Sequence, residues 1–166
     1  WEDYRSTGKE YCANLYGQSY TRCVSGDVNG DGGWNVLDIV GLANMVLDDV
    51  CLENPPANCC AADVNGDGGY NVLDIVQLAS CVLASNCDGL GRADDASHSK
   101  LIIENNMVSI EADGFIGGVQ MTLTHGDDFS IEMTDRALLA DHLTSGNETR
   151  LLVITPETDK LFSYRG

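Results

Sequence analysis

The sequence predicts a multi-domain α + β protein, in which a pair of loop–helix units is followed by a partial antiparallel β-sandwich. Two observations lead to this prediction. The segment DVNGDGGWNVLDIV at residues 27–40 recurs at 63–76 as DVNGDGGYNVLDIV, with Trp34 replaced by Tyr70 as the one change. Beyond residue 100 the apolar residues change from a helical to a strand-like period.

Composition divides the chain into four segments. Residues 1–22 are polar and aromatic, residues 23–88 contain the repeat, residues 89–99 form a polar, Gly-containing linker, and residues 100–166 form the predicted β domain. Trp1 stands where an initiator Met would be, and no signal peptide is recognisable. We therefore expect a processed or trimmed fragment.

The charge of the chain argues against several classes of partner. With 26 acidic and 9 basic residues, the formal net charge is -17. Such a chain repels nucleic acids and anionic membrane surfaces and attracts cations. Since no apolar run approaches the ~18 residues of a membrane span, we expect neither a nucleic acid partner nor membrane insertion.

Each copy of the repeat carries oxygen-bearing side chains at the spacing of a 12-residue calcium loop. Asp or Asn stands at loop positions 1, 3, 5, 9 and 12, and glycine at positions 6 and 7. Calcium is a hard cation that binds oxygen, and glycine at position 6 permits the sharp turn that brings these oxygens together. The predicted ligands of two Ca²⁺ ions are Asp27, Asn29, Asp31, Gly33 (by its carbonyl), Asn35 and Asp38, then Asp63, Asn65, Asp67, Gly69 (by its carbonyl), Asn71 and Asp74.

Two features qualify this metal-site prediction. Position 12 is Asp rather than the more common Glu, so the helix that follows must carry the shorter side chain inward. An Asx-rich turn with a helix-capping Asn would explain one such segment, but hardly two that match at every ligand position.

A single amphipathic helix is predicted after each loop. In the first copy the apolar stripe comprises Val36, Ile39, Val40, Ala43, Val46 and Leu47. The segments before the loops are short and poor helix formers, and Pro55 and Pro56 interrupt the chain between the copies. Each unit is therefore predicted to be a loop followed by a helix, with no helix entering the loop.

This arrangement resembles a dockerin, the duplicated calcium module by which extracellular proteins bind cohesin domains. The resemblance covers residues 23–88 and depends on D-x-N-x-D-G-x-x-N-x-x-D, which occurs twice, each time before one amphipathic helix. It implies two antiparallel helices, an extracellular or cell-surface location and a cohesin-like protein partner. The partner-reading positions 10 and 11 correspond to Val36, Leu37, Val72 and Leu73. Burial of these side chains against the rest of the chain is the alternative. We expect Trp34 and Tyr70, at position 8, to pack between the two loops.

The cysteines favour disulfides over a metal site, because the chain has no CxxC pair and its histidines lie outside the cysteine-rich region. The seven are Cys12, Cys23, Cys51, Cys59, Cys60, Cys81 and Cys87. Packing as in dockerins would bring Cys51 close to Cys59 or Cys60, and Cys87 close to Cys23. Cys12, Cys81 and one of Cys59 or Cys60 then remain, so one thiol is unpaired or pairs between chains.

The last segment reads as β structure. Two strands are predicted around a turn at Asn105 and Asn106, one over 117–125 and a buried one over 149–156, while 134–143 is left open between a helical turn and a crossover. The segment MVSIEADGFIGGVQMTLTHGDDFSIEM resembles the opening strands of a cohesin-like β-sandwich, although it supplies about half of the ~100 residues that a two-sheet sandwich requires. Either the sequence stops early or another chain supplies strands.

These observations predict an extracellular, calcium-stabilised, non-catalytic structural or docking protein that mediates protein–protein assembly. No nucleophile elbow or phosphate loop is present. One alternative is a subunit of a self-assembling extracellular fibre, in which another copy of the chain is the partner and a homo-polymer results. Another is the anchoring fragment of a larger secreted hydrolase. Asn147, in the NET sequon, is a glycosylation candidate or an ordinary polar turn.

Overall fold

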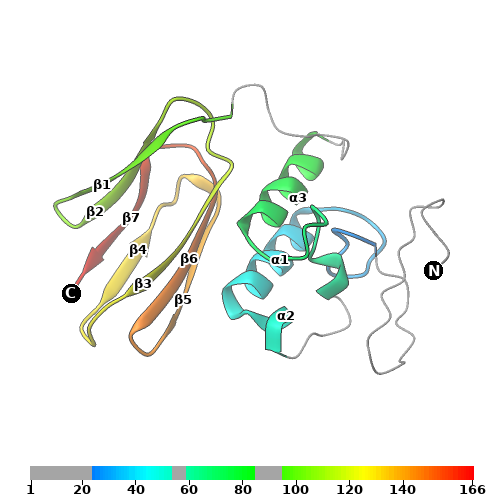
Figure 1. Cartoon of the computed structure of the whole chain (residues 1–166), viewed down its shortest axis with the longest axis horizontal. Helices are drawn as coiled ribbons and strands as arrows, with labels where there is room; N and C mark the ends of the chain where they lie inside the picture. The colour runs from blue at the N-terminus through cyan, green and yellow to red at the C-terminus, as the bar shows by residue number, and fades with distance from the viewer. Residues whose placement is uncertain (1–23, 54–58, 85–94) are drawn as a thin grey trace. The chain divides into compact units, whose positions relative to one another are not determined.

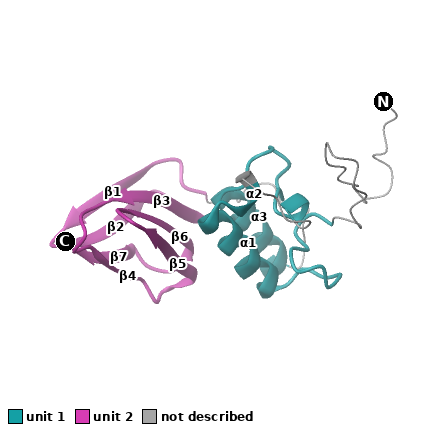
Figure 2. Ribbon diagram, turned by 90° about the horizontal axis from the view of Figure 1, so that it is seen from below, with its two compact units in different colours: residues 1–88 teal, residues 89–166 magenta. Residues whose placement is uncertain are grey.

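The computed structural model describes residues 24–53, 59–84 and 95–166. The chain divides into two compact units, Trp1–Asp88 and Gly89–Gly166 (Figure 2). The predicted segment 1–22 and most of the predicted linker 89–99 lie outside the described residues.

Unit 1 contains two helices of equal length, α1 (Val36–Asp48) and α3 (Val72–Ala84), each of 13 residues (Figure 1). They begin at equivalent positions of the repeat, one after each loop, as predicted. Between them lie the short helix α2 (Val50–Glu53) and the 3-10 turn η1 (Cys59–Ala61). The turn η1 precedes the second loop, where the sequence predicted no helix.

Helix α1 begins and ends at residues suited to its termini. Asn35 is the N-cap, with extended backbone, and it forms a capping box with Asp38. At the other end Asp49 adopts a left-handed conformation with φ 51°, and its N–H bonds to the carbonyl of Met45. Such caps give hydrogen-bond partners to the terminal backbone groups of a helix. The first helical turn is therefore fixed by residues of the preceding loop.

The buried stripe of α1 differs from the prediction in part. Its buried apolar residues are Ile39, Leu42, Ala43, Val46 and Leu47. Val36 and Val40, which the periodicity placed on the stripe, are exposed, whereas Leu42 is fully buried. The buried face is centred near Ile39 and Val46, so Val40 lies on the flank of the helix and Val36 lies in its exposed first turn.

Helix α3 supplies the facing apolar residues of unit 1. Ile75, Leu78 and Ala79 are buried, and α3 contacts α1. Since one amphipathic helix cannot bury its apolar face alone, the duplication gives each helix its partner.

Unit 2 consists of two antiparallel sheets. The four-stranded sheet has the order β1 (Ser99–Glu104), β2 (Met107–Ala112), β7 (Lys160–Arg165), β4 (Ser130–Met133). The three-stranded sheet has the order β3 (Gly118–Thr124), β6 (Glu148–Pro156), β5 (Ala137–Ser145). The predicted mixed α and antiparallel β character of the chain is thus confirmed.

Several predicted strands are present. Strands β1 and β2 form a hairpin in which Asn105 (φ 50°) and Asn106 (φ 62°) both take the positive φ of a type I′ turn. Strand β3 covers the segment predicted at 117–125, and β6 carries four consecutive buried residues within 149–156. The segment left open at 134–143 is a short crossover followed by most of β5.

The core of unit 2 lies between its two sheets. The buried residues are Val108, Leu161 and Phe162 from the first sheet and Leu151 and Val153 from the second. Residues before 99 also belong to this unit, because Asp95 bridges to Phe115. Among the described helices, none is long and apolar enough to cross a membrane.

Candidate metal-binding loops

The two loops, Asp27–Asp38 and Asp63–Asp74, turn at the glycines that the spacing indicated. Gly32 and Gly68, at position 6, have φ 92° and 85°. A side chain is rarely tolerated in this left-handed region. Both loops therefore have the sharp turn that folds their oxygen-bearing side chains back toward the helix start.

Position 5 collects hydrogen bonds from its own loop. The carboxylate of Asp31 accepts the backbone N–H of Gly33 at 3.0 Å and side-chain N–H groups of Asn29 at 2.9 Å and Asn35 at 3.2 Å. These bonds, the one from Gly33 first, lower the pKa of Asp31. Asp67 accepts the equivalent bonds from Gly69 and Asn65 in the second loop. Both carboxylates are thus oriented by their own loops.

Position 12 is carried inward by the helix in both loops, as the shorter Asp requires. Asp38 and Asp74 are fully buried. Asp38 accepts the backbone N–H groups of Asn29 at 3.1 Å and Asn35 at 2.9 Å. Burial raises the pKa of Asp74, repulsion from Asp63 adds to this rise, and backbone N–H groups oppose it. A nearby cation would offset the cost of burying these charges.

Position 1 tests whether the first loop fits a metal ion. Asp27 is 8% exposed. Its Oδ2 accepts the N–H of Gly32 at 3.1 Å, but within the described residues its Oδ1 is buried without a hydrogen-bond partner. An unpaired buried carboxylate oxygen is costly unless a cation or donor meets it. The residues of the first loop therefore fit a hard cation.

The second loop has the same set of oxygen donors, but the aspartate at its position 1 has different hydrogen bonds. Asp63 is partly exposed, and both of its carboxylate oxygens are engaged, Oδ1 by the N–H of Gly66 at 2.8 Å and Oδ2 by that of Gly68 at 3.1 Å. Within the described ranges, no three His, Cys, Asp or Glu side chains converge closely enough to hold a metal by themselves. The oxygen donors of both loops instead include asparagine amides, which suits calcium.

Short contacts join the segments that precede the two loops. The N–H of Gly26 donates to the carbonyl of Ala61 at 2.8 Å, and Ser25 Oγ donates to the carbonyl of Asp63 at 3.3 Å. Trp34 was expected to pack between the loops. It remains 48% exposed, and its indole N–H donates to the carbonyl of Ser25 at 3.0 Å, just before its own loop.

The predicted partner-reading positions lie beside the loops. Val36, Leu37 and Leu73 are 53%, 63% and 59% exposed, and Val72 is partly buried. Unit 1 itself therefore does not bury Val36, Leu37 and Leu73, and partner binding by these four residues stays a prediction. These side chains lie in the first turns of α1 and α3, next to the buried Asp38 and Asp74.

A disulfide joins Cys51 to Cys59, with Cα atoms 5.6 Å apart. This settles the alternative between Cys59 and Cys60 as the partner of Cys51. Cys60 and Cys81 are disulfide-bonded as well. The remaining cysteines, Cys12, Cys23 and Cys87, lie outside the described residues, and so does the predicted pairing of Cys23 with Cys87.

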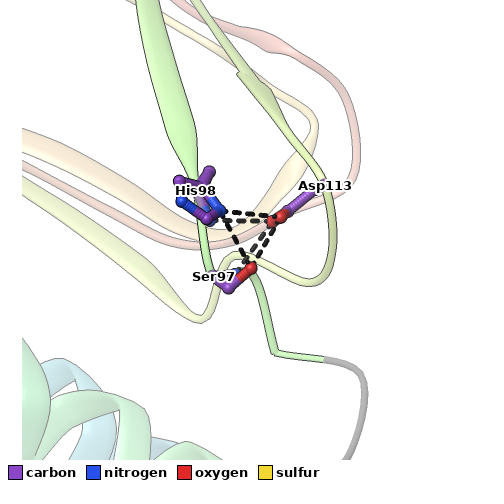
Figure 3. A network of polar contacts seen from close by, with 3 residues as sticks. All are labelled: Ser97, His98 and Asp113. Atoms are coloured by element: carbon purple, nitrogen blue, oxygen red, sulfur yellow. Dashed lines mark hydrogen bonds and ion pairs between the residues drawn. The ribbon is translucent and has the colours of Figure 1, made fainter.

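A polar network not foreseen from the sequence lies at the start of unit 2 (Figure 3). Asp113 accepts the hydroxyl of Ser97 at 2.7 Å and the backbone N–H groups of Ser97 and His98 at 2.8 and 2.9 Å. Ser97 Oγ and Asp113 Oδ2 both face the same ring nitrogen, Nδ1 of His98. In a catalytic triad the hydroxyl and the carboxylate use opposite nitrogens. We therefore interpret the network as structural: it holds residues 97–98 against the β2–β3 connection.

Asn147, the glycosylation candidate, is exposed between β5 and β6. Its Nδ2 donates to the carbonyl of His125 at 2.9 Å and to Asp127 at 3.1 Å. His125 in turn contacts the buried hydroxyl of Thr149 at 2.8 Å. The amide nitrogen that would carry a glycan thus already helps to hold the β3–β4 connection, and glycosylation of Asn147 stays a prediction.

Comparison with known proteins identifies the repeat region. Residues 25–83 match the family model of the dockerin type I domain. No curated protein and no solved structure matches the chain. The match ends before β1, so the cohesin-like resemblance of unit 2 stays unconfirmed. Dockerin domains are non-catalytic, calcium-binding docking modules of extracellular or cell-surface proteins, and their partners are cohesins. Residues 25–83 of this chain are a dockerin-like segment.

Proposed function

We propose that this chain is an extracellular, calcium-stabilised docking protein without catalytic activity, whose dockerin-like segment binds a cohesin-like domain of another protein. The supporting observation is the exposure of Leu37 and Leu73 at equivalent positions of the two helices, each beside the last aspartate of its loop. Exposed apolar side chains in a small, strongly acidic unit indicate a contact surface. The loop that starts each helix also positions this surface.

Two Ca²⁺ ions are proposed, one for each loop, held by the carboxylate, amide and carbonyl oxygens at positions 1, 3, 5, 7, 9 and 12. Bound calcium supplies positive charge that offsets the repulsion among three aspartates in each loop. Residues of the chain itself set the geometry of the contact surface. Asn35 and Asp38 fix the start of α1 and thereby the direction in which Leu37 points. Calcium binding and docking should therefore be coupled.

The test is binding of the full chain to immobilised cohesin domains, with calcium and with excess EGTA. We expect the chain to bind at least one of these cohesin domains in calcium and none of them in EGTA. The double substitution Leu37→Asp and Leu73→Asp should reduce affinity at least 100-fold, because a charge replaces a central apolar contact. Leu83→Asp is the matched control, since Leu83 is equally exposed but lies near the end of α3.

The control and the double variant must both be folded, which circular dichroism in calcium checks. Equal affinities of the control and the double variant would contradict the proposed surface. Failure of the folded chain to bind any cohesin domain of a broad panel in calcium would contradict the docking function itself.

A second candidate function, self-assembly by strand complementation, is favoured by one observation in unit 2. Leu101 and Ile103 of β1 pair with Ile110 and Val108, so they lie on the core side of their sheet. They are nevertheless 43% and 60% exposed. Three-residue connections join β4 to β5 and β6 to β7, so the two strands of each pair face each other across the two sheets. In the strand orders of the sheets, β3 then lies opposite β2, and no described strand lies opposite β1.

In this candidate function a second copy of the chain fills this place. The two copies would be related by a rotation of 180°. Strand β1 of each copy would then lie beside the free edge of β3 of the other copy and cover the other copy's Leu101 and Ile103. The outward side chains on β3 are the neutral Gln120, Thr122 and Thr124, so the joint brings no like charges together. An isologous joint closes as a dimer, and a fibre requires a second contact.

Sedimentation of the full chain over a range of concentrations tests this candidate. We expect a concentration-dependent dimer that Ile103→Lys abolishes, while Leu143→Lys, at an exposed position of β5, leaves the dimer intact. A monomer at all concentrations, or equal dimerisation of both variants, would contradict self-assembly through β1.

A further inference from the structure

The two calcium loops have the same ligands but differ in one structural respect. In the first loop Oδ1 of Asp27 is buried with no hydrogen-bond partner among the described residues. In the second loop the matching Oδ1 of Asp63 accepts the N–H of Gly66 at 2.8 Å, and Asp63 is more exposed. One loop thus holds a carboxylate oxygen ready for a cation, whereas the other uses that oxygen within the chain.

The single difference in sequence between the 14-residue copies lies close to this difference in structure. The indole N–H of Trp34 donates to the carbonyl of Ser25 at 3.0 Å, two residues before Asp27. In the second copy Tyr70 stands at this position, with a phenol hydroxyl in place of an indole N–H.

Gly26, which precedes Asp27, is held on several sides. A Cβ at Gly26 would lie 3.0 Å from Leu78 and 3.4 Å from the Trp34 ring, and its own φ is 84°. Its N–H donates to the carbonyl of Ala61 at 2.8 Å. Trp34 therefore contacts and holds the two residues that lead into Asp27, whose carboxylate is buried.

We propose that the first loop is the higher-affinity calcium loop of the two, and that Trp34 is the positioning residue that makes it so. The inference rests on the proposed calcium binding by both loops. A cation at the first loop gains a buried oxygen that has no partner to lose, and it relieves the cost of burying that charge. A cation at the second loop must share or displace the Gly66 N–H and competes with water at the more exposed Asp63. The bond from Trp34 to Ser25 orders the chain just before Asp27, which lowers the ordering cost of binding at the first loop.

Calcium titration of the full, initially calcium-free chain tests the inference by calorimetry. We expect two steps whose dissociation constants differ by at least about tenfold. Asp27→Asn should remove the tighter step and Asp63→Asn the weaker one. Trp34→Phe, which keeps a ring but loses the N–H, should weaken the tighter step several-fold. Tyr70→Phe is the matched control and should leave the tighter step unchanged.

A measurement on the unaltered chain covers the case in which a variant fails to fold. The backbone N–H signals of Gly32 and Gly68 report on the two loops separately by NMR. During the calcium titration the Gly32 signal should change at lower calcium than the Gly68 signal. Simultaneous changes, the reverse order, or a Trp34→Phe titration like that of the unaltered chain would overturn the inference while leaving calcium binding in place. Absence of any calcium-dependent heat or shift would overturn the proposed calcium binding and the inference with it.

Discussion

Asn35 and Asp38 cap the first helix of the dockerin-like segment reciprocally. The backbone N–H of Asn35 donates to Oδ2 of Asp38 at 2.9 Å, and the Asn35 side chain accepts backbone N–H groups of the first helical turn, including that of Leu37 at 2.8 Å. The same two residues are positions 9 and 12 of the first loop. The start of the helix and the end of the candidate metal site are therefore one structure.

Substitution of the N-cap should destabilise unit 1 even without metal. Asn35→Ala removes the acceptor for Leu37 N–H, and loss of such a cap costs about 1 kcal/mol. Urea unfolding in EGTA measures this cost without any contribution from a lost ligand. Asn44→Ala, at an exposed interior position of the same helix, is the control and should be neutral or slightly stabilising. Equal losses in the two variants would show that the cap contributes nothing.

The corrected buried stripe of α1 predicts a contrast between neighbouring positions. Leu42 is fully buried, so Leu42→Ala should lower the free energy of unfolding of unit 1 by about 3 kcal/mol. Val40 is exposed, so Val40→Ala should cost less than about 1 kcal/mol. Thermal unfolding in calcium compares the two. A larger loss of stability for Val40→Ala than for Leu42→Ala would contradict this orientation of the helix and support the one that the periodicity alone predicts.

The disulfide between Cys51 and Cys59 should stabilise unit 1 by restricting its unfolded chain. The sequence separation is 8, for which loop-closure entropy gives about 2.5 kcal/mol. The double variant Cys51→Ser and Cys59→Ser should unfold at a lower temperature by a corresponding amount, while retaining its helical circular dichroism in calcium. An unchanged melting temperature would mean that this bond does not constrain the unfolded chain.

Asp113 predicts a pH dependence in unit 2. The hydrogen bond from the Ser97 hydroxyl, with further bonds from His98 and Ser97 N–H groups, lowers the pKa of Asp113 from 3.8 to about 2. The folded state thus favours the charged form, so this contribution to stability is complete above about pH 4 and is lost as the pH falls toward 2. NMR titration of the Asp113 carboxyl should give a midpoint well below that of a free aspartate.

Amide exchange at Ser97 and His98 provides the matching structural readout. Relative to the intrinsic rate, their exchange should accelerate as the pH falls from 4 to 2, and in Asp113→Asn this relative rate should stay constant over the same range. A titration midpoint near 4 would contradict the network around Asp113.

Much of the fold was predictable because it depends on local patterns. The repeat, its offset and its glycines predicted two turns and two helices, and Asn105 with Asn106 predicted the β1–β2 hairpin. The resemblance also placed Cys51 beside its partner. Strand β7 was missed, because Leu161 and Phe162 are both buried and break the alternation that marks a half-buried strand.

Features that depend on tertiary packing could not be read from the sequence. The orientation of α1 depends on which of its residues α3 covers. The periodicity therefore placed the exposed Val40 on the buried stripe and missed the buried Leu42. The unpaired oxygen of Asp27 and the bond from Trp34 to Ser25 depend on how the chain enters the first loop. Two loops with identical ligands gave no sign of unequal surroundings, except for the exchange of Trp34 for Tyr70.

Thermal unfolding of the full chain in calcium and in excess EGTA tests the central claim most directly, namely that the two loops bind calcium and couple it to the folding of unit 1. The account predicts a markedly lower melting temperature for the helical signal in EGTA, restored by added calcium. Because the aspartates at position 12 cap the helices from within the loops, loosening of the loops should loosen α1 and α3 together. An unchanged melting temperature in EGTA would contradict the account.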